Sequence, residues 1–221
     1  TVADLEIEKQ KSVLLLRLSY PETIQKQNKI NAILKKVDCS DKPVIEIAQR
    51  CNQYIYENFT YTKGITNIET TVDEILTMKK GVCQDFAHVL LQLLRTVGIP
   101  SRYVSGYICP NESGLRGEGA THAWVEIYTP TQGWLGLDPT NNIWTMDNHI
   151  RLSVGKNFYD CTPVKGTFKG LARQTLSVSV SVGYEDGRHF EEINNVLLEE
   201  ATIEEKKQLD HIELLHQQQQ Q

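Results

Sequence analysis

The sequence has no long apolar run and no cluster of positive charge, and each absence excludes a class of partner. The longest apolar run, at residues 13–18, is interrupted by Arg17 and is far shorter than the ~20 residues that span a bilayer. The formal net charge is −5, and Lys and Arg are scattered along the chain instead of forming a basic stripe. We therefore expect neither a membrane-spanning segment nor a nucleic-acid partner.

The sequence also has no Cys-x-x-Cys pair. Its cysteines are odd in number and widely spaced, at Cys39, Cys51, Cys83, Cys109 and Cys161. Such a set is a poor framework for disulfides or zinc, so reduced thiols, a cytoplasmic location and no cofactor are expected. The chain starts without a basic and apolar leader, which predicts that a secretory signal is absent or removed.

No long linker rich in Pro, Gly or Ser divides the 221 residues, of which 40% are hydrophobic and 23% charged. This composition is typical of a globular protein with one main domain. We expect an N-terminal strand and helix segment at 1–40, a catalytic core at 41–185, and a polar, helical, Gln-rich tail at 186–221.

The apolar pattern changes from helical to alternating spacing along the chain. It predicts N-terminal strands between Leu5 and Tyr20, and then helices near 24–37, 43–55 and 71–78. Residues 83–97 are apolar nearly all round and predict a central buried helix. Alternating runs at 102–108, 122–128 and 134–138 predict an antiparallel sheet, which a strand at 168–184 extends. The fold class is thus α+β, with the central helix packed on the sheet.

Cys83 stands where the buried helix begins. Free backbone N–H groups and the helix dipole favour an anion at this end, so a thiolate is stabilised there and becomes a nucleophile. A buried structural cysteine is the ordinary alternative, and the position of Cys83 argues against it.

His122 and Asp138 are predicted to meet on one face of the sheet. If 129–133 is a hairpin loop, Tyr128 pairs with Trp134 and Trp124 lies opposite Asp138. Even-numbered residues then share a face, and His122 and Asp138 become diagonal neighbours within side-chain reach. This is the base and orienting carboxylate that a cysteine nucleophile needs. A structural histidine and a turn carboxylate before Pro139 are the ordinary alternatives.

Other polar and aromatic residues nearby have less specific interpretations. A zinc site from Cys83, His88 and His122 is disfavoured, because residues five apart on a helix diverge by about 140°. Hydrogen-bonding roles are expected for Asp85 and His88, and structural roles for Arg102, Tyr103 and Glu126. Trp124 and Tyr107 are candidates for substrate contact, with core packing as the alternative for Trp124.

Four sequence blocks resemble the bacterial transglutaminase-like superfamily. They are Gly-Val-Cys-Gln-Asp-Phe-Ala-His (81–88), Gly-Ile-Pro-Ser-Arg-Tyr-Val-Ser-Gly-Tyr (98–107), His-Ala-Trp-Val-Glu (122–126) and Gly-Trp-Leu-Gly-Leu-Asp-Pro-Thr (133–140). The similarity continues through 149–170, although residues 155–159 read Gly-Lys-Asn-Phe-Tyr where the family usually has an arginine–aspartate pair.

The resemblance implies a papain-like core in which Cys83 is the nucleophile, His122 the general base and acid, and Asp138 its orienting partner. It implies a cysteine protease or amidase that hydrolyses peptide or side-chain amides of a peptide or protein substrate through a thioester. Two alternatives stay open: amine transfer to protein glutamine, and noncatalytic peptide binding. Oligomeric state is not specified by the sequence.

Overall fold

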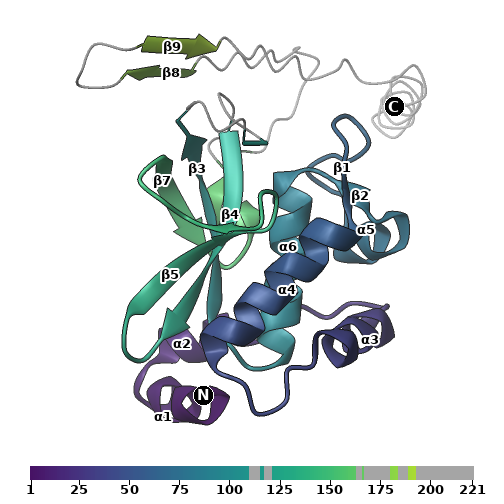
Figure 1. The fold of residues 1–221 in the computed structure, drawn as a ribbon, viewed down its shortest axis with the longest axis vertical. Coiled ribbons are helices and arrows are strands. Elements are labelled where there is room, and N and C mark those ends of the chain that lie inside the picture. Colours follow the sequence, from purple (N-terminus) through teal and green to yellow (C-terminus); the bar gives the residue numbers. More distant parts are fainter. Residues whose placement is uncertain (110–114, 117–120, 163–165, 167–179, 184–188, 193–221) are drawn as a thin grey trace, which may run out of the picture.

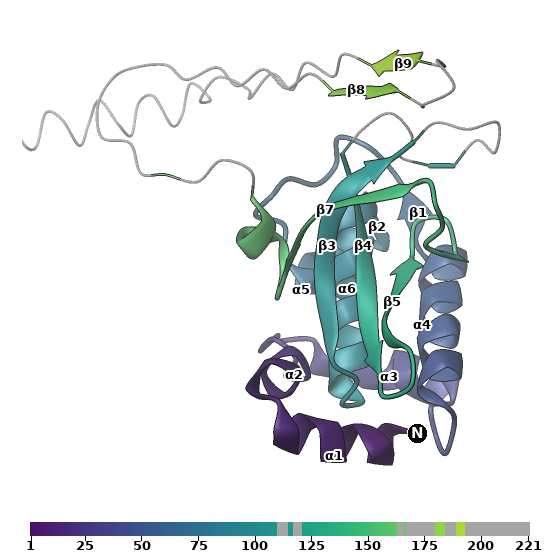
Figure 2. The ribbon, with the colours of Figure 1, turned by 90° about the vertical axis from the view of Figure 1, so that its left-hand side faces the viewer.

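The computed structural model describes residues 1–109, 115–116, 121–162, 166, 180–183 and 189–192. Helices pack against one side of a five-stranded antiparallel sheet, and Figure 2 shows α6 behind β3 and β4. The helices are α1 (Val2–Lys11), α2 (Val13–Leu18), α3 (Gln27–Val37), α4 (Val44–Asn58), α5 (Val72–Met78), α6 (Cys83–Thr96) and the 3-10 helix η1 (Phe158–Cys161).

The main sheet has the strand order β6-β5-β4-β3-β7, and two small sheets accompany it. In chain order the strands are β1 (Thr60–Tyr61), β2 (Lys80–Gly81), β3 (Ser101–Ile108), β4 (Thr121–Thr129), β5 (Gly133–Asp138), β6 (Ile143–Trp144), β7 (His149–Gly155), β8 (Val180–Gly183) and β9 (His189–Glu192). The predicted α+β class is confirmed, as is the hairpin in which Tyr128 pairs with Trp134.

The central helix α6 supplies much of the core. Its apolar residues are almost completely buried, as the sequence pattern predicts: Phe86, Ala87, Val89, Leu90, Leu91, Leu93 and Leu94. They pack against the inner face of the sheet, where Ala123, Val125 and Ile127 alternate with outward-facing residues of β4. Helix α4 lies across α6, as Figure 1 shows, and its buried residues belong to the same core as those of α6.

The prediction of N-terminal strands is wrong, because residues 2–11 and 13–18 form α1 and α2. Thr1 and Asp4 form a capping box that starts α1, and the Ser12 hydroxyl accepts the Leu15 N–H to start α2. In α2 only Leu15 and Leu18, three residues apart, are buried. These caps impose a helical period on a run whose apolar residues also fit loose alternation.

The C-terminal predictions also need correction where the structure describes the chain. Strand β8 pairs with β9 in a separate two-stranded sheet, so it does not extend the main sheet. Residues 189–192 of the predicted helical tail form β9, because they pair with β8. The other residues of these two predictions, 168–179, 184, 186–188 and 193–221, lie outside the described part. Within the described part, no helix has both the length and the apolarity to cross a membrane.

A β-bulge and a glycine shape the sheet between β3 and β7. The register shifts between Ser105 and Gly106, so that Arg151 lies opposite Gly106 and His149 opposite Ile108. A Cβ at Gly106 would lie 2.0 Å from the Ile150 carbonyl oxygen and 2.6 Å from Trp124 Cη2. The missing side chain therefore lets β7 and the Trp124 ring approach β3 closely.

Gly106→Ala is expected to destabilise the protein by at least about 3 kcal/mol, because the nearest atom belongs to the backbone of β7 and the strand itself must move. Urea unfolding measures the change. Gly166→Ala is the matched control, since a Cβ there meets no atom within 4 Å. Equal midpoints for the two variants would show that β7 adjusts without cost.

Candidate active site

Cys83 is the first residue of α6 and is half-buried. Its position is held by Asp85, whose buried carboxylate accepts the Val82 N–H at 2.8 Å and the Thr66 hydroxyl at 2.6 Å. Burial raises the pKa of Asp85, and these two hydrogen bonds oppose the rise. His88 accepts the Phe158 N–H at 3.2 Å, so it fastens η1 to α6. The hydrogen-bonding roles expected for Asp85 and His88 are confirmed.

The side chains of His122 and Asp138 meet where β4 and β5 lie side by side. His122 Nε2 lies 2.9 Å from Asp138 Oδ2, and both side chains are fully buried. The other imidazole nitrogen, Nδ1, is buried and has no hydrogen-bond partner among the described residues. The predicted diagonal approach across the hairpin is confirmed, and it leaves Nδ1 for a third group.

Asp138 and Cys83 both affect the charge of the imidazole. Burial alone would lower the pKa of His122, but hydrogen bonding and charge from Asp138 and Cys83 outweigh it and raise the pKa to about 10. Burial would raise the pKa of Asp138, yet its donors, His122 first, hold it well below its ordinary range. The thiol thus interacts with His122, although no well-aligned hydrogen bond joins them. Such contacts are commonly loose before substrate binds.

The carboxylate of Asp138 has more donors than the sequence indicated. Its Oδ1 accepts the Thr140 N–H at 2.8 Å, and its Oδ2 accepts Asn141 Nδ2 at 2.7 Å. The Asp-Pro-Thr turn could have signalled the first of these, since Asp side chains commonly bond the backbone N–H two residues on. A second histidine, His149, points Nε2 at the same Oδ2 from 3.5 Å, and no local signal predicted it.

Tyr61 is a further neighbour that sequence reasoning missed. It pairs with Gly81, two residues before Cys83, and its ring packs edge-on against Phe86 of α6. Burial, followed by the charge of Cys83, raises the pKa of Tyr61 to about 12. The phenol therefore keeps its proton at neutral pH, close enough to the thiol to sense its charge.

The family profile described as the Transglutaminase-like superfamily matches residues 31–139, which hold all three candidate residues. The matched segment, residues 31–139, is a transglutaminase-like core. An uncharacterized protein of Mycobacterium tuberculosis is 37% identical over 150 residues, which cover 64% of this chain and 48% of that protein. The match therefore spans about half the length of this mycobacterial relative.

Two further comparisons concern proteins with functional names. A protein-glutamine gamma-glutamyltransferase of Pseudomonas aeruginosa is 33% identical over 109 residues, covering 46% of this chain and 16% of that protein. A solved structure titled "Putative Cysteine Protease" from Cytophaga hutchinsonii has a TM-score of 0.56 and 25% identity, covering 67% of this chain and 49% of that one. Both are consistent with the transglutaminase-like core.

The two candidates for substrate contact, Trp124 and Tyr107, differ in how deeply they are buried. Trp124 is only 1% exposed and stacks on His122 with ring centroids 6.3 Å apart, so in this conformation it packs around the imidazole. Tyr107 is half-buried on β3 opposite Thr121, one residue before His122. Arg102 and Glu126 lie opposite each other on β3 and β4 and form an ion pair at 2.6 Å, which confirms their structural role.

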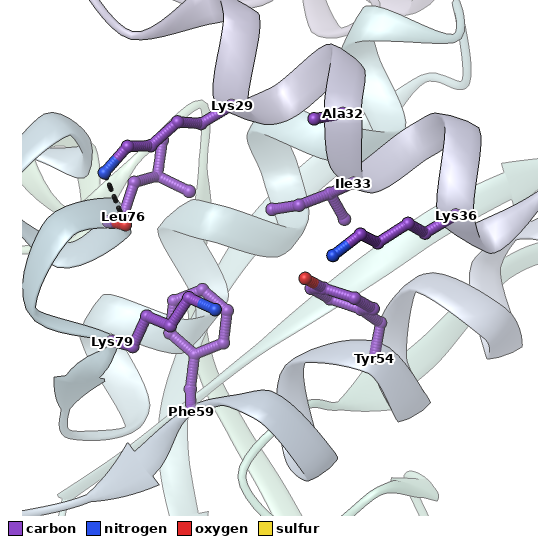
Figure 3. Close-up of a pocket in the computed structure, with 8 residues that line it drawn as sticks. All are labelled: Lys29, Ala32, Ile33, Lys36, Tyr54, Phe59, Leu76 and Lys79. Carbon is purple, nitrogen blue, oxygen red and sulfur yellow. Dashed lines mark hydrogen bonds between the residues drawn. The ribbon is translucent and has the colours of Figure 1, made fainter.

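Two hollows lie apart from the candidate triad. The first, about 160 Å³, is mostly apolar; Figure 3 shows its lining of Lys29, Ala32, Ile33, Lys36, Tyr54, Phe59, Leu76 and Lys79. The second, about 380 Å³, lies between α4 and the β5–β6 edge. Neither is lined by Cys83, His122 or Asp138. Among the described residues, no group of three or more His, Cys, Asp or Glu side chains is arranged to hold a metal ion.

Proposed function

We propose that this transglutaminase-like protein is a thiol hydrolase of peptide or side-chain amides. Cys83 attacks the amide carbonyl, His122 protonates the leaving amine, and water then hydrolyses the thioester. The observation that carries the proposal is the buried contact between His122 and Asp138, which leaves the second imidazole nitrogen free beside a cysteine at a helix N-terminus.

The charges around His122 suit the two proton transfers. With the pKa of His122 raised to about 10, the imidazole is positively charged at neutral pH and is ready to act as an acid. The Cys83 charge is one cause of this raised pKa, and acylation of the sulfur removes it. The imidazolium then releases its proton more readily, at the moment when the leaving amine needs one.

Hydrolysis is preferred to amine transfer for a physical reason. Water and an amine compete for the same thioester, and the amine wins only where a dry site raises its effective concentration. Cys83 is half-buried, so this residue is not fully enclosed by protein. The name of the Pseudomonas relative supports amine transfer as the second candidate.

A glutamine-containing peptide library incubated with excess primary amine tests the choice. Mass spectrometry should detect released ammonia or cleaved peptide in excess over amine adducts, because Cys83 is not fully enclosed by protein. Adducts that outnumber hydrolysed products, and that disappear in Cys83→Ala, would establish the transferase instead. The absence of every product, together with peptide binding that survives Cys83→Ala, would favour a binding module.

A further inference from the structure

The carboxylate of Asp138 is shared by two imidazoles that come from different strands. His122 lies on β4 and His149 on β7, and both direct Nε2 at the same oxygen, from 2.9 and 3.5 Å. The His149 side chain is only 1% exposed. Its ring stands edge-on to Trp124 and to His122, with centroids 5.4 and 6.3 Å away. These two histidines, Trp124 and Asp138 therefore form one buried cluster.

The bulge between Ser105 and Gly106 brings His149 into this cluster. As observed, His149 lies opposite Ile108, which shares a sheet face with Gly106 and its partner His122. Without the extra residue in β7, Ile150 would occupy that position and His149 would turn to the other face. Gly106 then leaves room for the Trp124 ring to cross β3 toward His149.

Hydrogen bonds on the far side of the His149 ring indicate where its proton lies. The Met146 N–H points at Nδ1 from 3.3 Å, and a backbone amide can only donate. Asn148 Oδ1 lies 2.9 Å from Nδ1, while the buried Asn148 Nδ2 has no partner in the described part of the chain. Amide oxygen and nitrogen positions are assigned from their hydrogen bonds, and exchanging the two atoms of Asn148 turns the unpartnered donor Nδ2 toward Nδ1. Nδ1 is then an acceptor, and the proton is on Nε2, facing Asp138.

We propose that His149 is a positioning residue whose Nε2–H donates to Asp138 Oδ2, so that it holds the carboxylate and draws part of its charge away from His122. Asn141, His122 and His149 together offer Oδ2 three donors, one more than its two lone pairs accept at full strength. His149 thus competes with His122 for the oxygen and limits how tightly the base is bound. The inference rests on the proposed function of His122 as that base.

Nuclear magnetic resonance of labelled imidazoles in the Cys83→Ala protein tests this inference without any assay of hydrolysis. His149→Phe keeps a ring against Trp124 but removes the donor, and it is expected to raise the pKa of His122 by about 0.5 to 1. His149→Gln places an amide donor near the former Nε2 and should restore the parent value. Asp138→Asn is the positive control and should lower the pKa of His122 toward its ordinary 6.5.

An unchanged or lower His122 pKa in His149→Phe, with the Asp138→Asn control responding, would overturn the inference. If His149→Phe does not fold, the parent protein still decides, because nitrogen shifts report the tautomer of His149 directly. Protonated Nε2 with bare Nδ1 supports the proposal, and the opposite tautomer contradicts it. Failure of the hydrolase proposal would appear separately, as absence of Cys83-dependent products despite the expected imidazole titrations.

Discussion

Cys83→Ala is expected to abolish amide hydrolysis, with a loss of roughly 10⁴- to 10⁶-fold in turnover. The physical reason is that the thioester cannot form without the sulfur, and His122 alone offers no covalent route. Ammonia release or peptide cleavage, measured on a substrate found in the peptide library, gives the rate. Folding should be nearly unaffected, because Cys83 is half-buried at a helix start where alanine also fits.

Cys39→Ala is the matched control for the loss of a thiol. Cys39 is also half-buried, whereas Cys51, Cys109 and Cys161 are buried. This variant should retain full turnover. Turnover that persists in Cys83→Ala would refute nucleophilic catalysis by Cys83.

Asp138→Asn is expected to lower turnover by about 10⁴-fold, since the amide can present a donor to His122 Nε2 and so favour the wrong tautomer. It should also destabilise the fold by about 2–4 kcal/mol, because three donors lose a buried charged acceptor. Turnover on the library substrate and urea unfolding measure the two effects.

The pH dependence of stability provides a second test of the buried pair, best made in Cys83→Ala so that the thiol does not titrate. A folded-state pKa of His122 above 6.5 contributes stability that is complete below pH 6.5 and is lost as pH rises. The low folded-state pKa of Asp138 contributes stability above 3.8 that is lost as pH falls. Urea midpoints should therefore decline as pH rises above 6.5.

Adding Asp138→Asn to this background should flatten the decline, because His122 then titrates near its ordinary value in both states. Cys83→Ala/Cys39→Ala serves as the control, since it leaves the buried pair intact and should keep the slope of Cys83→Ala. A decline that is just as steep without the carboxylate would mean that His122 does not owe its raised pKa to Asp138.

Much of the site could be predicted because it depends on short-range rules. The hairpin loop at 129–133 fixes which residues of β4 and β5 pair, and alternation then puts His122 and Asp138 on one face. The apolar run that begins at Cys83 likewise marks the start of α6. In both cases, the determining residues are neighbours in the sequence.

Other features resisted prediction because competing local signals were nearly equal or because distant segments decide them. Residues 5–20 fit loose alternation and helical spacing, and the caps at Thr1 and Ser12 favour helices. Alternation left both substrate contact and core packing open for Trp124, and the structure shows it buried with His122 and His149 packed against it. Alternation reports the face of a strand, and it does not report what covers that face.

The sequence by itself determined the α+β class, the central helix and the pairing of His122 with Asp138. Only the tertiary structure decided that His149 joins them, because its orientation depends on the bulge opposite Ser105 and Gly106. A bulge in one strand reverses the faces of all residues beyond it, and pairing between β3 and β7, more than forty residues apart, leaves no trace in the local pattern of either strand. Whether His149 reaches the Asp138 carboxylate therefore depends on how the strands assemble into the sheet.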